Sequence, residues 1–283
     1  MEQEAIVLDL VHMIRNDLPR VGSEKLHFLL TPTLRRSGIK MGRDKLHNLL
    51  LSHGLTIKRK KPRPRTTNSD HWMKKYPNLI AGLEVTFPGQ VLVSDITYVD
   101  LLGGDFSYLS LVTDAYSRMI LGWALSTSLR TEEGPSLALN QAFSHLPETE
   151  AVSIHHSDKG SQYCSEIYTQ SLLSRNIRIS MTQSGDPREN AIAERVNGIL
   201  KHEFGLGATY DNHKAALQAT HIAINNYNNK WPHGSIDNLT PNQAFQTRGP
   251  LLNRWKKKKG MSEPEKMIIQ GDWGQPQTPR FDC

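Results

Sequence analysis

A single acidic residue interrupts the most strand-like stretch of the chain. Residues 90–99 read Gln-Val-Leu-Val-Ser-Asp-Ile-Thr-Tyr-Val, and the acid is Asp95. The β-branched and aromatic residues around it are typical of a strand. An unpaired carboxylate in such a run would cost stability. Asp95 is therefore a stronger candidate for a functional carboxylate than an acid on a surface loop.

The segments that follow this strand predict an α/β fold. The first three strands are separated by short turns, which indicates an antiparallel meander. Later strands enter through helical crossovers. The order predicts a mixed five-stranded sheet with flanking helices, as in a ribonuclease-H-like domain. Further strands are predicted at 108–113, 119–125, 152–156 and 177–181, and helices from Thr131 onwards, near 165–174, at 189–204 and at 212–230.

The N-terminal part of the chain differs from this pattern. Residues 1–57 carry apolar side chains at helical spacing in three blocks, with a turn-like break at 37–42. This predicts a small all-α, helix-turn-helix-like DNA-binding region. Residues 58–86 are predicted to be a basic linker, because six cations and two prolines fall within its first eight residues. We expect these cations to contact DNA phosphates, although a solvated charge run that only separates two domains is the alternative. They are Lys58, Arg59, Lys60, Lys61, Arg63 and Arg65.

Composition excludes several other classes of protein. The 34 Lys+Arg and 28 Asp+Glu give a formal net charge of +6, which is compatible with an acidic partner. The two cysteines, Cys164 and Cys283, do not build a disulfide framework and lack zinc-ligand spacing. No apolar window is long enough for a membrane span, and no signal peptide is recognisable. We expect a cytoplasmic protein with no membrane partner, a core at 87–248 and a basic, flexible tail at 249–283.

Three carboxylates occupy related places in the predicted order. Asp95 lies within the first strand, Asp158 directly follows the fourth, and Glu194 lies in the helix after the fifth. Sites in α/β sheets form beyond the carboxyl ends of adjacent strands. If the first and fourth strands are neighbours, Asp95 and Asp158 come together, and a helix that crosses nearby can bring in Glu194. Carboxylates suit hard cations such as Mg²⁺, and two such ions can promote phosphoryl transfer. Each acid taken alone is more often a solvated surface charge.

The predicted helix at 189–204 has two distinct faces. Glu194, Asn197 and Lys201 follow one another at helical spacing and share one face, apart from the apolar stripe. An acid, an amide and a cation on one face suit a helix that lies along a phosphate backbone. The alternative is an ordinary amphipathic helix with a mixed surface. The apolar stripe consists of Ile192, Val196, Ile199, Leu200 and Phe204.

The spacing of the acids and the segments around them resemble a known family. Between Asp158 and Glu194 lie 194 − 158 − 1 = 35 residues. This spacing, together with Asp95-Ile-Thr-Tyr, His156-Ser-Asp-Lys-Gly-Ser-Gln-Tyr and Asn228-Asn-Lys-Trp-Pro-His-Gly, resembles the Asp-Asp-Glu transposases and retroviral integrases. Within this superfamily, the likeness is to the downstream-frame transposases of two-frame bacterial insertion sequences. It covers residues 90–245.

This resemblance implies a specific activity. It implies an integrase core that cleaves DNA at the ends of an insertion sequence and transfers the strands, using two Mg²⁺ or Mn²⁺ ions per active site. Asp95, Asp158 and Glu194 are the implied catalytic and metal-binding residues. The implied partners are the terminal inverted repeats, target DNA, further copies of the chain and the upstream-frame protein. The implied location is the bacterial cytoplasm, and the nucleoid when DNA is bound. DNA contacts are expected from Lys159, Asn197 and Lys201.

Two other functions remain open. A nuclease for RNA–DNA hybrids or DNA junctions could share the fold, but such enzymes usually carry additional acids and lack the basic arm. Alternatively, the chain could be a DNA-binding regulator or an inactive remnant, although all three acids are present. Metal-dependent nicking and joining of DNA ends would separate these possibilities.

Overall fold

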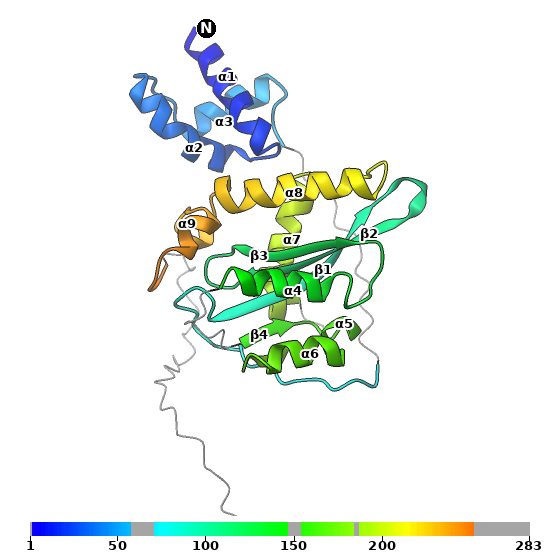
Figure 1. Ribbon diagram of the computed structural model, residues 1–283. Coiled ribbons are helices and arrows are strands. Elements are labelled where there is room, and N and C mark those ends of the chain that lie inside the picture. The colour runs from blue at the N-terminus through cyan, green and yellow to red at the C-terminus, as the bar shows by residue number, and fades with distance from the viewer. Residues whose placement is uncertain (1, 58–70, 147–153, 184–186, 252–283) are drawn as a thin grey trace, which may run out of the picture.

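The computed structural model describes residues 2–57, 71–146, 154–183 and 187–251. A group of three helices lies at one end of the molecule, and a sheet flanked by helices makes up the remainder (Figure 1). None of the described helices is both long and apolar enough to cross a membrane.

A mixed five-stranded sheet forms the centre of the larger part. Its strand order is β3-β2-β1-β4-β5. The pairs β1–β2 and β2–β3 are antiparallel, whereas β1–β4 and β4–β5 are parallel. The predicted mixed sheet is therefore confirmed, and its first and fourth strands are neighbours. The strands are β1 Val91–Asp100, β2 Phe106–Asp114, β3 Ile120–Ser126, β4 Ile154–Ser157 and β5 Arg178–Met181.

Helices cover both faces of the sheet. Successive side chains of a strand point to opposite faces, so Leu92 packs with α4 and α6 whereas Val99 packs with α7 and α8. Helix α4 crosses β3 closely at Gly122. A Cβ at this position would lie 1.9 Å from the carbonyl oxygen of Ala138. The helices are α4 Pro135–Ser144, α5 Ser161–Cys164, α6 Glu166–Leu173, α7 Ala191–Glu203, α8 His213–Lys230 and α9 Pro241–Phe245, with 3-10 turns at Leu102–Gly104, Pro187–Asn190 and Gly234–Ile236.

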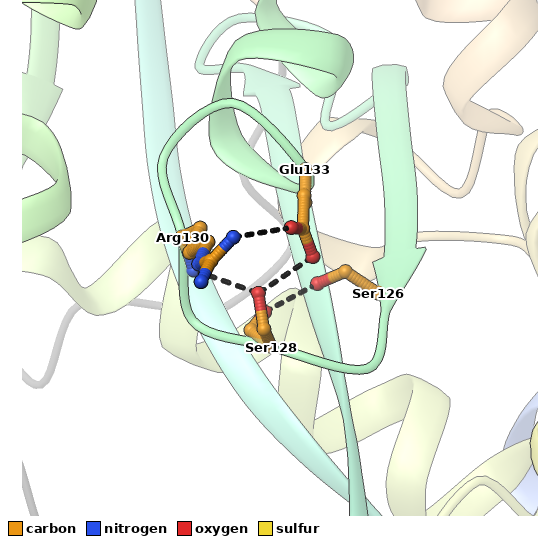
Figure 2. Close-up of polar contacts among 4 residues, drawn as sticks. All are labelled: Ser126, Ser128, Arg130 and Glu133. Carbon is orange, nitrogen blue, oxygen red and sulfur yellow. Dashed lines mark hydrogen bonds and ion pairs between the residues drawn. The ribbon is translucent and has the colours of Figure 1, made fainter.

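The turn that leads from β3 into α4 is held by its own side chains (Figure 2). Ser126 Oγ donates to the carbonyl of Ser128 at 2.7 Å, and Ser128 Oγ donates to Glu133 Oε2 at 2.7 Å. Arg130 forms an exposed ion pair with Glu133 at 3.6 Å. These contacts fix a surface turn whose charged groups remain largely in solvent, so the ion pair contributes little to stability.

The N-terminal region is all-helical, as predicted. It consists of α1 Glu2–Asp17, α2 Ser23–Arg36 and α3 Arg43–Ser52. The turn between α2 and α3 is pinned by two hydrogen bonds. Ile39 N donates to the carbonyl of Leu34 at 2.9 Å, and His27 Nε2 lies 2.9 Å from the carbonyl oxygen of Met41. The two helices are thus held in the helix, turn, helix arrangement that the sequence indicates.

Helix α8 separates this helical region from the sheet (Figure 1) and contacts both. Lys230 Nζ forms an ion pair with Asp17 at 2.8 Å, and Asn226 Nδ2 donates to the backbone carbonyl of Asp17 at 3.1 Å. The ammonium of Lys25 lies 3.7 Å from the ring centroid of the buried Trp231. Cation–π, polar and apolar contacts therefore join the two parts.

Residues 71–86, the end of the segment expected to be a linker, pack along the sheet domain; we call them the strap. Leu79 N donates to Ser180 Oγ at 2.8 Å, and Met181 N donates to the carbonyl of Pro77 at 3.2 Å, so the strap follows the outer edge of β5. Its apolar side chains also pack on the core. Within the described residues, packing on the sheet domain thus includes 71–86, which precede the core boundary expected at residue 87. The basic part of the linker at 58–70 and the tail beyond residue 251 lie outside the described residues.

Three histidines of the described residues, His155, His156 and His233, are buried in uncharged form. His155 Nε2 lies 2.8 Å from Ser94 Oγ and 2.9 Å from the hydroxyl of Tyr168, and burial lowers the pKa of His155 to about 3. His233 Nε2 lies 3.0 Å from the hydroxyl of Tyr227, and burial holds its pKa well below 6.5. Between pH 6.5 and the lower folded-state values, the unfolded chain binds more protons than the folded chain. Stability is therefore lost as the pH falls below about 6.5.

We expect the free energy of unfolding to decrease as the pH is lowered from about 7 to about 5. A His233→Gln variant should show a weaker dependence, because a glutamine amide can donate to the Tyr227 hydroxyl, which itself donates to the Arg118 carbonyl, without taking up a proton. Urea unfolding at a series of pH values measures both slopes. Identical slopes for the two proteins would mean that His233 titrates alike in the folded and unfolded chains.

Candidate active site

The parallel pairing of β1 with β4 brings the first two predicted acids to the same level of the sheet. The pairing ends with Val93 opposite His156. Asp95 lies two residues after Val93 in β1. Asp158 lies two residues after His156, just past the end of β4, so continuing the register places the two acids level with each other. Asp95 is buried, with 9% of its surface exposed, and Asp158 is half-buried. The predicted juxtaposition of these two acids thus follows from the strand register.

A buried tyrosine lies within electrostatic range of both acids. Burial raises the pKa of Tyr163 well above its usual value, and Tyr168, Asp95 and Asp158 raise it further. The Tyr163 hydroxyl therefore stays protonated beside the two carboxylates. Tyr163 ends the motif that begins at His156, but the sequence alone assigned it no role.

The loop after β4 is fixed by short-range and long-range hydrogen bonds. Gly160 N donates to Asp158 Oδ1 at 3.0 Å. His71 Nε2 of the strap lies 2.7 Å from the carbonyl oxygen of Lys159. The ammonium of Lys159, expected to contact DNA, donates to the carbonyl of Gln183 at 2.7 Å. The backbone next to Asp158 is therefore held from the strap and from the end of β5.

Helix α7 is anchored to β1 by two side-chain amides. Asn190 Nδ2 donates to the carbonyl of Ser94 at 3.0 Å, and Asn197 Nδ2 donates to Asp95 Oδ2 at 2.8 Å. Glu194 lies between these asparagines, four residues after one and three before the other, so it shares their helix face. That face is turned towards β1, and Glu194 is half-buried there. The third predicted acid is therefore carried to the part of β1 that holds Asp95.

Asn197 occupies a different environment from the one the sequence suggests. We expected it to contact DNA together with Lys201, but only 6% of its surface is exposed. Its amide is directed at Asp95, because the face that it shares with Glu194 packs on β1. The structure thus indicates a positioning role for Asn197. Lys201 is half-buried in the last turn of α7.

The three acids provide the ligand chemistry of a hard divalent cation. Carboxylate oxygens are the donors that Mg²⁺ and Mn²⁺ prefer. Asp95 also accepts from Ile96 N at 3.0 Å, and a carboxylate has about four acceptor positions. Within the described ranges, no three His, Cys, Asp or Glu side chains gather tightly enough to form a ready metal cluster. The register aligns Asp95 with Asp158, and Glu194 lies on the face of α7 that is turned towards β1.

Comparison with known proteins agrees with this architecture. Residues 86–187 and residues 175–241 match two family models that are each described as an integrase core domain. A stretch of 222 residues, 77% of this chain, is 34% identical to the "Insertion element IS600 uncharacterized 31 kDa protein" of Shigella sonnei and covers 80% of it. A stretch of 197 residues, 70% of this chain, is 32% identical to the "Transposase for insertion sequence element IS629" of the same species and covers 65% of it.

Among solved structures, the HTLV-2 integrase catalytic core domain in complex with magnesium aligns with a TM-score of 0.45. The identity is 18%, and the alignment covers 56% of this chain and 98% of that one.

The sheet, the two family models and the insertion-element relatives define a class of protein. The chain belongs to the integrase-core family, within the superfamily of Asp-Asp-Glu transposases and integrases. Its relatives within that family include proteins of bacterial insertion elements. The predicted superfamily, the ribonuclease-H-like fold and the enzyme class, a DNA transposase or integrase, are confirmed.

We expect Asn197→Ala to lower the free energy of unfolding by about 1–3 kcal/mol, because a buried carboxylate loses a hydrogen-bond donor. Asn197→Asp should be less stable still at neutral pH, since it places a second carboxylate beside Asp95. Urea unfolding measures both changes. Asn48→Ala, at an exposed position of α3, is the control and should change stability little. Equal stability of the Asn197 and Asn48 variants would contradict the positioning role.

Proposed function

We propose that this chain is the catalytic subunit of an insertion-sequence transposase, which cleaves DNA at the element ends and joins the strands to target DNA. The observation that carries this proposal is the β1–β4 register, which places Asp95 level with Asp158. Helix α7 adds Glu194 to the same part of β1 through the asparagines on either side of it. Membership of the integrase-core family supports the same activity.

In this proposal Asp95, Asp158 and Glu194 hold two divalent cations, Mg²⁺ or Mn²⁺. When bound, such ions would neutralise phosphate charge and activate a water or a 3′-hydroxyl for in-line displacement. The chain's own contribution is to fix the ligands. Asn197 orients the carboxylate of Asp95, and the Gly160 N–H orients that of Asp158. Hydrogen bonds of this kind restrict how far a ligand can rotate, which favours binding of the ion.

The helical region is the proposed recognition module. Helix α3 follows the pinned turn at 37–42, and the N-terminal residues of such a helix contact base edges in helix-turn-helix proteins. Its side chains Arg43, Lys45 and His47 are exposed and suit a major groove. The cations at 58–65, whose placement lies outside the described residues, would contact phosphates between this module and the active site. Lys159 and Lys201 are proposed to add positive charge near the acids.

We further propose that the chain works on DNA as an oligomer. Joining the two ends of an element requires that both ends be held at once, which a single active site with one recognition module does not do. The upstream-frame protein, as a partner or a fusion, is the proposed source of additional end recognition. The active complex would then contain at least two copies of this chain with the terminal repeats and target DNA.

Each of the substitutions Asp95→Asn, Asp158→Asn and Glu194→Gln should abolish strand cleavage and joining, because a neutral amide binds a divalent cation far more weakly than a carboxylate does. DNA binding should remain close to that of the wild type. The measurement is joining of a labelled, end-derived duplex with Mg²⁺ or Mn²⁺, compared with the same reaction in EDTA. Glu133→Gln, in the surface turn of Figure 2, makes the same chemical change outside the site and should remain active.

A second readout separates ligand loss from misfolding. Mg²⁺ or Mn²⁺ should raise the Tm of the wild type and of Glu133→Gln, since a cation that binds only the folded state stabilises it. The Tm of Asp95→Asn should respond much less. Strong residual joining by any two of the three acid variants would contradict the assignment. Tight DNA binding by the wild type with no joining would instead favour a regulator or a chain that requires its upstream partner.

Replacing the six cations between Lys58 and Arg65 with glutamine should weaken binding to all DNA sequences alike. Phosphate contacts release counterions, so the slope of log affinity against log salt should become shallower by up to about 0.9 for each contact removed. Titrations at several salt concentrations, on end-derived and unrelated duplexes, measure this. A selective change in the preferred sequence would argue against phosphate contacts by this segment.

A further inference from the structure

Trp72 is a large apolar side chain that the fold leaves in solvent. It is 93% exposed, more than any other large apolar residue in the described part of the chain. Single exposed apolar residues are common on protein surfaces and need no explanation by themselves. Trp72 differs because its surroundings are fixed, basic and close to the candidate active site.

The backbone on both sides of Trp72 is pinned. His71 Nε2 lies 2.7 Å from the carbonyl oxygen of Lys159, and Met73 packs with the apolar cluster beneath α4 and α6. Further along, Gln183 Nε2 donates to the carbonyl of Tyr76 at 3.1 Å. The strap therefore holds a fixed path at Trp72 while its indole makes almost no contact with the protein. Because the backbone is already held, ligand binding at Trp72 has to restrict only the torsions of its side chain.

The position of Trp72 is set relative to the acids by the same contacts. His71, the residue before Trp72, contacts the carbonyl oxygen of Lys159. Lys159 directly follows Asp158 in the sequence. Asp158, Lys75 and Lys159 all act on the thiol of Cys164. Burial and, after it, Asp158 raise the pKa of Cys164, the two lysines lower it, and the resulting value is about 11. The segment carrying Trp72 is thus next to the Asp158 loop and contributes positive charge there.

Aromatic rings beside cations are the chemistry by which proteins bind single-stranded nucleic acid. Bases stack on aromatic faces, and lysines neutralise the phosphates between them. Lys74 and Lys75 are both exposed and lie two and three residues after Trp72. An internal base of a duplex has both faces covered by its neighbours, so an indole can stack only on a base that has left the duplex.

We propose that Trp72 binds an unpaired nucleobase of the DNA strand at the active site, with Lys74 and Lys75 beside the adjoining phosphates. This inference rests on the proposed function, because it requires DNA at the Asp158 loop. It adds a stacking subsite for a frayed or terminal nucleotide. Trp72 would hold the strand end in place next to the carboxylates and would take no part in the chemistry.

Binding of a labelled oligothymidylate by the full chain, in EDTA, tests the subsite without any strand cleavage. Trp72→Ala should weaken binding by about fivefold to a hundredfold, the range that corresponds to loss of one base–aromatic stack. Trp72→Phe should retain most of the affinity. Phe106→Ala, which removes an exposed aromatic at the tip of the β1–β2 hairpin, should bind like the wild type. All four proteins should have similar Tm values, since none of these changes removes a core residue.

The salt dependence separates stacking from charge. Trp72→Ala should keep the wild-type slope of log affinity against log salt, because the indole makes no phosphate contact. The double variant Lys74→Gln, Lys75→Gln should have a shallower slope. Affinity of Trp72→Ala equal to that of the wild type would overturn the proposal, whatever the result of the joining assay. If Trp72→Ala weakens oligothymidylate binding but the wild type never joins DNA, the base-binding site is supported and the proposed function is contradicted.

Discussion

The parallel pairing of β1 with β4 is the constraint on which the site depends. Antiparallel pairing of β1 with β2 needs only a short turn, but a parallel neighbour can enter only after a helical crossover. Here α4 supplies that crossover and delivers the end of β4 beside the middle of β1. Asp95 then lies in the interior of a strand while Asp158 lies just past the end of one. The continued register therefore aligns a buried acid, Asp95, with a half-buried one, Asp158.

Burying Asp95 is possible because α7 supplies a partner for it. The orientation of α7 is set mainly by its apolar stripe, in which Val196, Ile199 and Leu200 belong to the same cluster as Val99 of β1. Once that stripe is packed, the face with Asn197 is directed at Asp95. Glu194 is turned the same way because it lies one helical turn earlier. Apolar packing therefore determines where the polar ligands lie, and the amide offsets part of the cost of the buried charge.

Local patterns explain which features could be predicted from the sequence. The strands, the helices and the three acids follow from alternation, helical spacing and turns, which are encoded over a few residues. The contact of His71 with Lys159 joins residues 88 positions apart, and no local pattern indicates it. A linker was expected at 58–86 because cations and prolines dominate the start of that segment. Its last part packs instead, since Met73, Leu79 and Ile80 cover the sheet domain. Helical spacing also could not tell whether Asn197 faces DNA or β1.

The segment around Trp231 shows how a sequence motif near the end of the core can serve architecture. Both groups of the Asn228 amide bond to Ile120 of β3, one to its N–H at 3.0 Å and one to its carbonyl at 2.9 Å, so this side chain closes an outer sheet edge. Three residues later, Trp231 is buried beneath the ammonium of Lys25 from α2. The motif thus links the edge of the sheet to the helical region. If α3 binds DNA, these contacts largely set the distance between α3 and the three acids. The packing of α8 would then fix the position of cleavage relative to the recognised sequence.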